Sequence, residues 1–127
     1  MASSVIDAST LLALVNNEPG ADKAAGFIAD AVISAVNLAE AISKLVERGA
    51  TMSDARAAFA LLPLEVADFT RPLAEMAGGL VATTRAHGLS LGDRACLALA
   101  SRLALPAVTA DRAWAELNLD VEVILIR

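Results

Sequence analysis

The 127-residue sequence contains no tyrosine, three phenylalanines, one tryptophan, one histidine and one cysteine. With so few aromatic rings, it does not offer the stacking platforms on which single-stranded bases are bound. The single cysteine, Cys96, cannot form an internal disulfide, so the composition does not favour a secreted protein. Cys96 lies on the apolar face of a predicted helix, where we expect a buried thiol. A zinc site is disfavoured as well, because zinc prefers several His and Cys ligands at set spacings.

The sequence also lacks a long hydrophobic run. Uncharged runs such as Ala8–Asn17 and Ala31–Ala39 are far shorter than the ~20 apolar residues of a membrane-spanning helix. Asp7 interrupts the N-terminal region, where a signal peptide would continue in apolar residues. We therefore expect a cytoplasmic protein that does not cross a membrane.

Positive charge is scarce, because ten Lys and Arg residues stand against fifteen Asp and Glu residues, for a formal net charge of -5. Proteins that bind nucleic acids usually carry a basic surface, since neutralising phosphates supplies much of their affinity. The charge therefore argues against a DNA- or RNA-binding module, and any proposed nucleic-acid function has to account for it.

Apolar residues, in contrast, make up 57% of the chain and fall into short runs between polar and turn residues. The length is typical of one domain, so we expect residues 1–127 to form a single domain. Short apolar runs alternating with amphipathic segments indicate an α/β fold with a parallel sheet covered on both faces. Strands are predicted at residues 5–6, 32–34, 64–68, 107–109 and 121–126, the last of them at a sheet edge. Helices are predicted from a cap at Ser9 or Thr10 to residue 15, at residues 21–31, from a cap at Asn37 to Gly49, from Thr51 or Ser53 to residue 62, and at residues 70–86, 91–104 and 112–117.

Four acidic residues stand where predicted strands end or where the following helices begin. Asp7 ends the first strand, and Asp111 follows the strand at residues 107–109. Glu40 and Asp93 lie in the first turns of predicted helices. Because ligands of open α/β sheets bind beyond the carboxyl ends of the strands, we expect these four acids to converge there.

Each acid also has a purely structural interpretation. Glu40 stands three residues after Asn37, and Asp93 stands three residues after a serine, which is the spacing of a capping box. Asp7 and Asp111 precede predicted helices, whose free N–H groups a carboxylate can cap. Four independent caps need not all fall at one edge of a sheet, and this coincidence favours a shared site.

Converging carboxylates repel one another unless a cation neutralises them. Clustered oxygen ligands suit Mg²⁺, with Mn²⁺ as a substitute. Two such ions form the clamp used in phosphodiester cleavage, in which one activates water and the other stabilises the leaving oxygen. The acids therefore predict a magnesium site, and whether it holds one ion or two stays open.

Four segments, in their order and spacing, resemble the pattern of PIN domains and in particular the VapC-type toxins of bacterial toxin–antitoxin modules. They are VIDAS at residues 5–9, SAVNLAE at 34–40, LSLGDRA at 89–95 and VTADR at 108–112. The resemblance covers almost the whole chain. It implies a PIN-like α/β sandwich, with a central, mostly parallel sheet of about five short strands and helices on both faces. It also implies a Mg²⁺-dependent endoribonuclease that a cognate antitoxin holds inactive.

The same resemblance implies a role for each acid. Asp7 and Asp93 match positions that bind the metal directly. Glu40 matches a residue that binds the metal or orients the attacking water. Asp111 matches a residue that binds the metal directly or through water, so all four are predicted catalytic and metal-site residues.

Five further residues flank these acids. Ser9 and Thr109 match small hydroxyl positions that hydrogen-bond the metal-binding carboxylates. Asn37 stands where many family members have a hydroxyl residue, and it either supports the site or caps its helix. Arg94 and Arg112 each follow a predicted ligand, and they either contact RNA phosphates or form salt bridges with the acids.

The resemblance further implies an RNA substrate such as tRNA or rRNA, cut at an exposed loop. It implies a homodimer or a toxin–antitoxin hetero-oligomer, and the apolar helix around residues 55–62 is either core or a surface for such a partner. Two alternatives remain. A phosphatase of the haloacid-dehalogenase type also places an Asp after its first strand, although it generally has a second Asp where this chain has Ser9. A non-catalytic PIN module would bind only a metal ion or a partner.

The resemblance also bears on the acidic charge. The four predicted ligands supply most of the negative excess, so the rest of the chain is close to neutral. We therefore expect the metal-free protein to bind RNA poorly, and metal to be needed for RNA binding as well as for cleavage.

Overall fold

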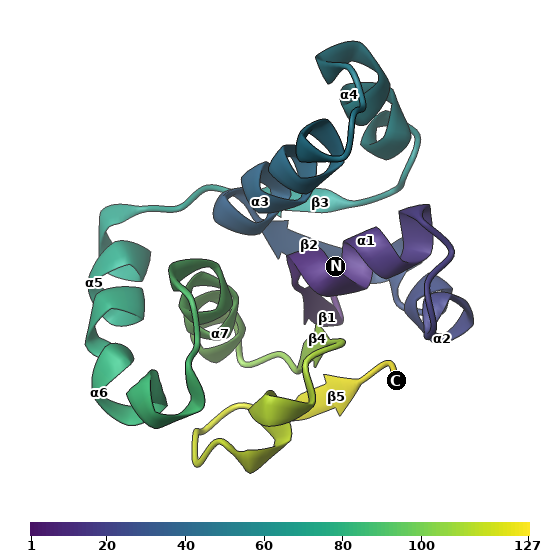
Figure 1. The fold of residues 1–127 in the computed structure, drawn as a ribbon. Helices are drawn as coiled ribbons and strands as arrows, with labels where there is room; N and C mark the ends of the chain where they lie inside the picture. Colours follow the sequence, from purple (N-terminus) through teal and green to yellow (C-terminus); the bar gives the residue numbers. More distant parts are fainter.

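Five short strands form one sheet in the order β3-β2-β1-β4-β5, and all four pairings are parallel (Figure 1). The computed structural model describes residues 1–127. The predicted α/β fold with about five short strands is confirmed, and the last strand does lie at an edge. The strands are β1 (Ser4–Ile6), β2 (Ala31–Ser34), β3 (Glu65–Ala67), β4 (Ala107–Thr109) and β5 (Val123–Leu125).

Seven α-helices and three short 3₁₀ helices connect these strands. None of the helices has the length and apolar character that crossing a membrane requires. The α-helices are α1 (Ala8–Val15), α2 (Ala21–Ala25), α3 (Ala35–Glu47), α4 (Met52–Ala60), α5 (Arg71–Gly79), α6 (Val81–Thr84) and α7 (Leu91–Leu103). The 3₁₀ helices are η1 (Ile28–Asp30), η2 (Arg85–His87) and η3 (Arg112–Glu116).

Two predicted helices are broken in the structure. The segment at residues 21–31 divides into α2 and η1, because the N–H of Gly26 bonds to the carbonyl of Lys23 and ends the α-helical pattern. The segment at residues 70–86 divides into α5, α6 and η2, with the first break directly after Gly78 and Gly79. Glycine loses more backbone entropy in a helix than any other residue, so helices break readily at such positions.

Alternate strand residues point to opposite faces of the sheet, and each face carries its own core. Ile6, Ile33 and Val108 belong to a core covered by α1 to α4. Val5 and Val32 belong to a second core covered by α5 and α7. Figure 1 shows these two groups of helices on either side of the sheet. Both faces are buried, so the central strands read as continuous apolar runs, and polar side chains begin only where the strands end.

Candidate active site

All four predicted acids line one cavity of about 320 Å³ at the carboxyl ends of the central strands. Asp7 follows β1, and Asp111 lies two residues after the end of β4. Glu40 comes from α3, and Asp93 comes from the first turn of α7, which packs against α3. The remaining residues of the cavity wall are Ala8, Ser9, Lys44 and Ser90. Chain segments more than 100 residues apart thus contribute acids to one place.

Asp7 is the most buried of the four, with 3% of its surface exposed. It is also the N-cap of α1, because its Oδ1 accepts the N–H of Thr10 at 2.9 Å. The predicted cap at Ser9 or Thr10 is therefore wrong, since the helix begins directly after the strand. Burial raises the pKa of Asp7, and hydrogen bonds from Thr109, Thr10 and Ser9 oppose that rise.

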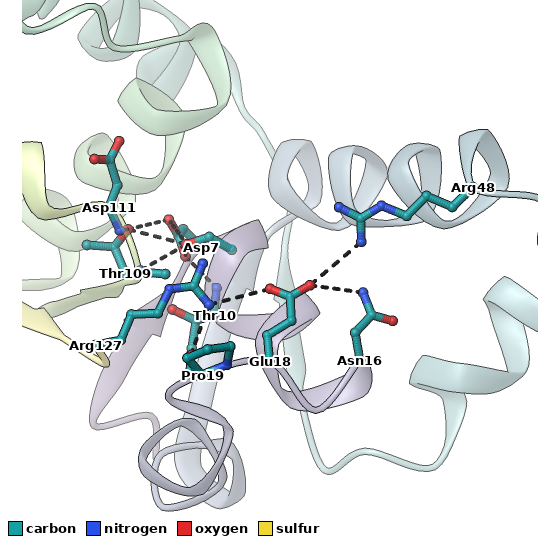
Figure 2. Close-up of polar contacts among 11 residues, drawn as sticks. Asp7, Thr10, Asn16, Glu18, Pro19, Arg48, Thr109, Asp111 and Arg127 are labelled. Atoms are coloured by element: carbon teal, nitrogen blue, oxygen red, sulfur yellow. Dashed lines mark hydrogen bonds and ion pairs between the residues drawn. The ribbon is translucent and has the colours of Figure 1, made fainter.

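Two hydroxyl groups hold the Asp7 carboxylate, as expected from the sequence, and Figure 2 shows the contact from Thr109. Thr109 donates to Oδ2 at 2.6 Å, and Ser9 lies 2.8 and 2.9 Å from the two carboxylate oxygens. The same hydroxyl oxygens accept backbone N–H groups from Asp111 at 3.0 Å and Ala110 at 2.9 Å. This network fixes the turn after β4 to the end of β1, and with it the position of Asp111.

Asp93 and Asp111 cap helices and also line the cavity. Asp93 and Ser90 form a capping box, in which Asp93 Oδ2 accepts the N–H of Ser90 at 2.9 Å. Asp111 caps η3 by accepting the N–H of Ala113 on Oδ1 at 3.0 Å. Each cap uses one carboxylate oxygen, so the structural interpretation and the shared site are compatible.

Glu40 reaches the cavity because α7 approaches α3 very closely at Gly92. A Cβ atom at Gly92 would lie 2.6 Å from Oε1 of Glu40. Asn37, which is 1% exposed, donates from Nδ2 to the carbonyl of Gly92 at 2.9 Å. Ser34, not Asn37, caps α3, since the helix starts directly after β2. The predicted cap at Asn37 and the capping-box role of Glu40 are therefore wrong, and Asn37 instead joins the two helices behind the acids.

Two arginines were predicted beside the acids, and the salt-bridge alternative for them is wrong, whereas their contact with RNA phosphates stays a prediction. Arg94 donates to the carbonyl of Ala77 at 2.9 Å and does not line the cavity. Arg112 is exposed, and neither arginine forms a salt bridge with an acid. The cation that does line the cavity is Lys44, which the sequence interpretation missed. The sequence could have indicated Lys44, because it stands four residues after Glu40 and this spacing places both side chains on one helix face.

Cys96 lies in the core next to these acids. It is fully buried, as predicted from its helix face. Burial raises the pKa of the thiol well above its ordinary value of 9.0, and the charges of Asp7, Asp93 and Glu40 raise it further. We therefore expect the thiol to stay protonated and unreactive while the protein is folded.

The donor set of the cavity fits a hard divalent cation such as Mg²⁺ or Mn²⁺, since four carboxylates supply only oxygen ligands. A cation would also offset the penalty of burying the Asp7 charge. No three of these side chains lie close enough together to chelate one ion in this structure. The cavity thus has the chemistry of a magnesium site without a preformed ligand geometry.

The parallel sheet, its two helical layers and the acidic cavity define an α/β protein of the PIN type. A model of the PIN domain matches residues 4–119, so the chain belongs to the PIN-domain family. A search of curated proteins finds no match.

Solved structures of VapC and VapBC proteins have the same fold. DNA-bound VapBC from Salmonella typhimurium is 19% identical, with 100% of both chains covered and a TM-score of 0.79. VapC20 of Mycobacterium tuberculosis, described as a sarcin-ricin loop cleaving toxin, is 21% identical over 94% of this chain and 99% of that one, with a TM-score of 0.76. VapBC-1 from nontypeable Haemophilus influenzae is 17% identical over 97% of each chain, with a TM-score of 0.71. At these identities the likeness establishes a shared fold.

Proposed function

We propose that this protein is a Mg²⁺-dependent endoribonuclease toxin of a toxin–antitoxin module, which hydrolyses RNA phosphodiester bonds with metal-activated water. One observation carries the proposal: four carboxylates from four separate segments line one cavity of a PIN-family fold. Structural caps alone would not need to share a cavity.

In this proposal Asp7 and Asp93 hold the metal, Glu40 binds it or orients the attacking water, and Asp111 binds it directly or through water. Bound Mg²⁺ would supply an activated water and stabilise the charge that develops on the phosphate. Asp7 is suited to its role because hydroxyl and N–H donors already fix its carboxylate. Asp93 and Asp111 each keep one oxygen outside their caps.

The proposed substrate is a structured RNA such as tRNA or rRNA. Its support comes from the fold that this chain shares with VapC toxins, and not from the charge of the cavity. VapC20, described as cleaving the sarcin-ricin loop, supports an RNA loop as the substrate. A structural neighbour from Klebsiella pneumoniae, 20% identical with a TM-score of 0.74, is described as a toxin–antitoxin complex, which supports a cognate antitoxin as the partner. A basic antitoxin segment would be attracted to the acidic cavity, and assembly as a homodimer or hetero-oligomer is part of the proposal.

The phosphatase alternative has lost its support. The chain belongs to the PIN family, and Ser9 hydrogen-bonds Asp7 at the position where that chemistry generally has a second Asp. A non-catalytic PIN module is the remaining alternative, and a cleavage experiment separates it from a ribonuclease.

The test is cleavage of total RNA by the purified, antitoxin-free protein. We expect cutting in Mg²⁺ or Mn²⁺, none in EDTA, and none by Asp7→Asn or Asp93→Asn. Asp22→Asn is the matched control, because it neutralises an exposed carboxylate outside the cavity. Cleavage that persists in both ligand variants would refute the assigned site, and a wild-type protein that cuts no RNA with either ion would identify a non-catalytic module.

A further inference from the structure

One cation faces four carboxylates in the acidic cavity. Lys44 lies on α3, one turn after Glu40, and both side chains line the cavity. None of the other nine Lys and Arg residues of the chain does so. Residues four apart on a helix are neighbours, so the ammonium group lies within reach of the same space as the Glu40 carboxylate.

Lys44 is nevertheless unpaired. A Glu followed four residues later by a Lys is the favoured orientation for a helical ion pair, yet Lys44 forms no salt bridge with Glu40. The three salt bridges of the structure all involve Glu18 or Glu75 instead. Arg48, the C-cap of α3 four residues after Lys44, pairs with Glu18 at 3.6 Å (Figure 2). Lys44 is exposed, so its charge is available to an anion that enters from solvent.

An acidic cavity needs such a charge if its substrate is a polyanion. Metal bound to the carboxylates would compensate the charge only at the phosphate that is attacked. The next phosphate along the strand carries its own negative charge, and Lys44 is the basic side chain that lines the cavity beside the acids. A lysine is suited to a single phosphate, because its ammonium is a compact point charge with three donors on a flexible stem.

We propose that Lys44 binds an RNA phosphate adjacent to the one that is hydrolysed. The inference rests on the proposed ribonuclease function and makes Lys44 a substrate-binding residue beside the metal ligands. The competing role is a permanent counter-ion for the carboxylates. A counter-ion would weaken metal binding through charge repulsion and would not contact RNA.

The test compares Lys44→Ala and Lys44→Arg with wild type on an RNA hairpin that the wild type cuts. For Lys44→Ala we expect KM to rise about tenfold while kcat changes less than about twofold, since a uniform binding contact is lost. The dependence of log kcat/KM on log salt concentration should become shallower by about 0.7, the value for one phosphate contact to a single strand. Lys44→Arg should restore most of the wild-type KM.

Arg102→Ala is the control, because it removes the same charge from an exposed position in the last turn of α7, outside the cavity. It should leave the KM and the salt dependence as in wild type. The inference is overturned if Lys44→Ala keeps the wild-type salt dependence, if Arg102→Ala changes it equally, or if Lys44→Ala only tightens Mn²⁺ binding. Matching thermal melts of the variants would show that all of them are folded.

Binding of the same hairpin, labelled and followed by fluorescence anisotropy in Mg²⁺, separates the two proposals. If the wild type cuts no RNA, the ribonuclease proposal fails, and the Lys44 inference is judged by binding alone. Weaker binding by Lys44→Ala than by wild type then supports Lys44 as a contact to an RNA phosphate, without a cleavage site beside it. Equal binding, or no binding by the wild type, overturns it.

Discussion

Helix α3 separates two cavities of opposite character. Glu40 and Lys44 line the acidic cavity, whereas Leu38 and Ile42 line an apolar cavity of about 210 Å³ between α3, α4 and β3. Residues two positions apart on a helix point to opposite sides, so one helix serves both cavities. The other residues around the apolar cavity are Arg56, Phe59, Ala60, Leu64 and Val66.

The two sides of α3 differ in what they do for stability. Phe59, beside the apolar cavity, belongs to the core and gains stability by removing apolar surface from water. Asp7, beside the acidic cavity, is buried with a raised pKa, which shows that the fold disfavours its charged form. The comparison indicates that apolar burial on one side of α3 stabilises the fold, whereas the buried carboxylate on the other side destabilises it when charged.

The largest effect that tests this comparison is expected from Asp7→Asn. Cleavage should fall by about a thousandfold or more, equivalent to about 4 kcal/mol, because a metal ligand is lost. The metal-free variant should melt no lower than wild type, since an amide can still cap α1. Mn²⁺ should raise the melting temperature of the wild type and not that of the variant.

The stability of the metal-free protein should depend on pH through the ionisation of Asp7. With a pKa raised above 3.8, Asp7 stays protonated in the folded protein at pH values where the unfolded chain has ionised. Its contribution to the stability of the metal-free protein is therefore complete below pH 3.8 and is lost as the pH rises toward the folded pKa. Asp7→Asn should remove this loss in melts recorded in EDTA from pH 4 to pH 8. A variant that melts well below wild type at pH 8 would contradict the comparison.

On the apolar side of α3, Phe59→Ala should lower stability and leave cleavage unchanged, which is the reverse of Asp7→Asn. We expect it to lower the free energy of unfolding by about 3 kcal/mol, since a large core side chain is lost. Cleavage by the protein that remains folded should equal that of wild type. Urea denaturation measures the first quantity and active-site titration with cleavage measures the second. Phe59→Leu, which keeps most of the volume, should lose about 1 kcal/mol. A specific loss of cleavage in either variant would show that the two sides of α3 are coupled.

Gly92→Ala tests the close approach of α7 to α3. The added Cβ would lie 2.6 Å from Glu40 Oε1 and 3.3 Å from Asn37 Nδ2, so the Glu40 carboxylate has to move. We expect Mn²⁺ affinity, measured by calorimetry, to fall about tenfold, as for other changes that displace metal ligands. Stability should change little, because the atom that has to move is at the end of the partly exposed Glu40 side chain.

Gly78→Ala is the matched control, because no atom lies within 4 Å of its added Cβ and the residue is also helical. It should leave Mn²⁺ affinity unchanged and stabilise the helix by up to about 1 kcal/mol. Equal metal affinity in both alanine variants and wild type would show that Glu40 does not depend on the gap at Gly92.

The smallest effect concerns Cys96. With full burial and a strongly raised pKa, its thiol should not react with a thiol-specific reagent at pH 8 while the protein is folded. Modification should appear only as the protein unfolds, at a rate that follows the urea transition. Rapid modification of the native protein would show that the core below the acids opens readily.

The parts of the site that follow from local pattern and topology were predictable. The runs at residues 5–6, 32–34 and 107–109 predict strands because they are short, apolar and flanked by polar residues. Parallel strands share one carboxyl edge, and this is why Asp7 and Asp111 meet there. The hydroxyl partners Ser9 and Thr109 lie within two residues of these positions, so the structure places them close to the carboxylate.

The parts that depend on packing between helices were not predictable. Asn37 looks like a cap from its spacing to Glu40, yet Ser34, three residues earlier, already caps the helix. Arg94 follows a predicted ligand, yet its side chain turns toward the end of α5. These outcomes depend on how neighbouring helices meet, which residue spacing within one segment does not specify.

The sequence by itself determined the alternation of strands and helices, the family and the four acids, because these depend on local periodicity and on the order of motifs. Only the tertiary structure decided that α7 meets α3 at Gly92, that Asn37 joins them, and that an unpaired Lys44 shares the cavity with the acids. The physical reason is that contacts between distant helices are set by the shapes of both surfaces together, and each surface alone is compatible with several neighbours. Positive charge is scarce in the whole chain, and at the cavity it is reduced to one side chain, the unpaired Lys44.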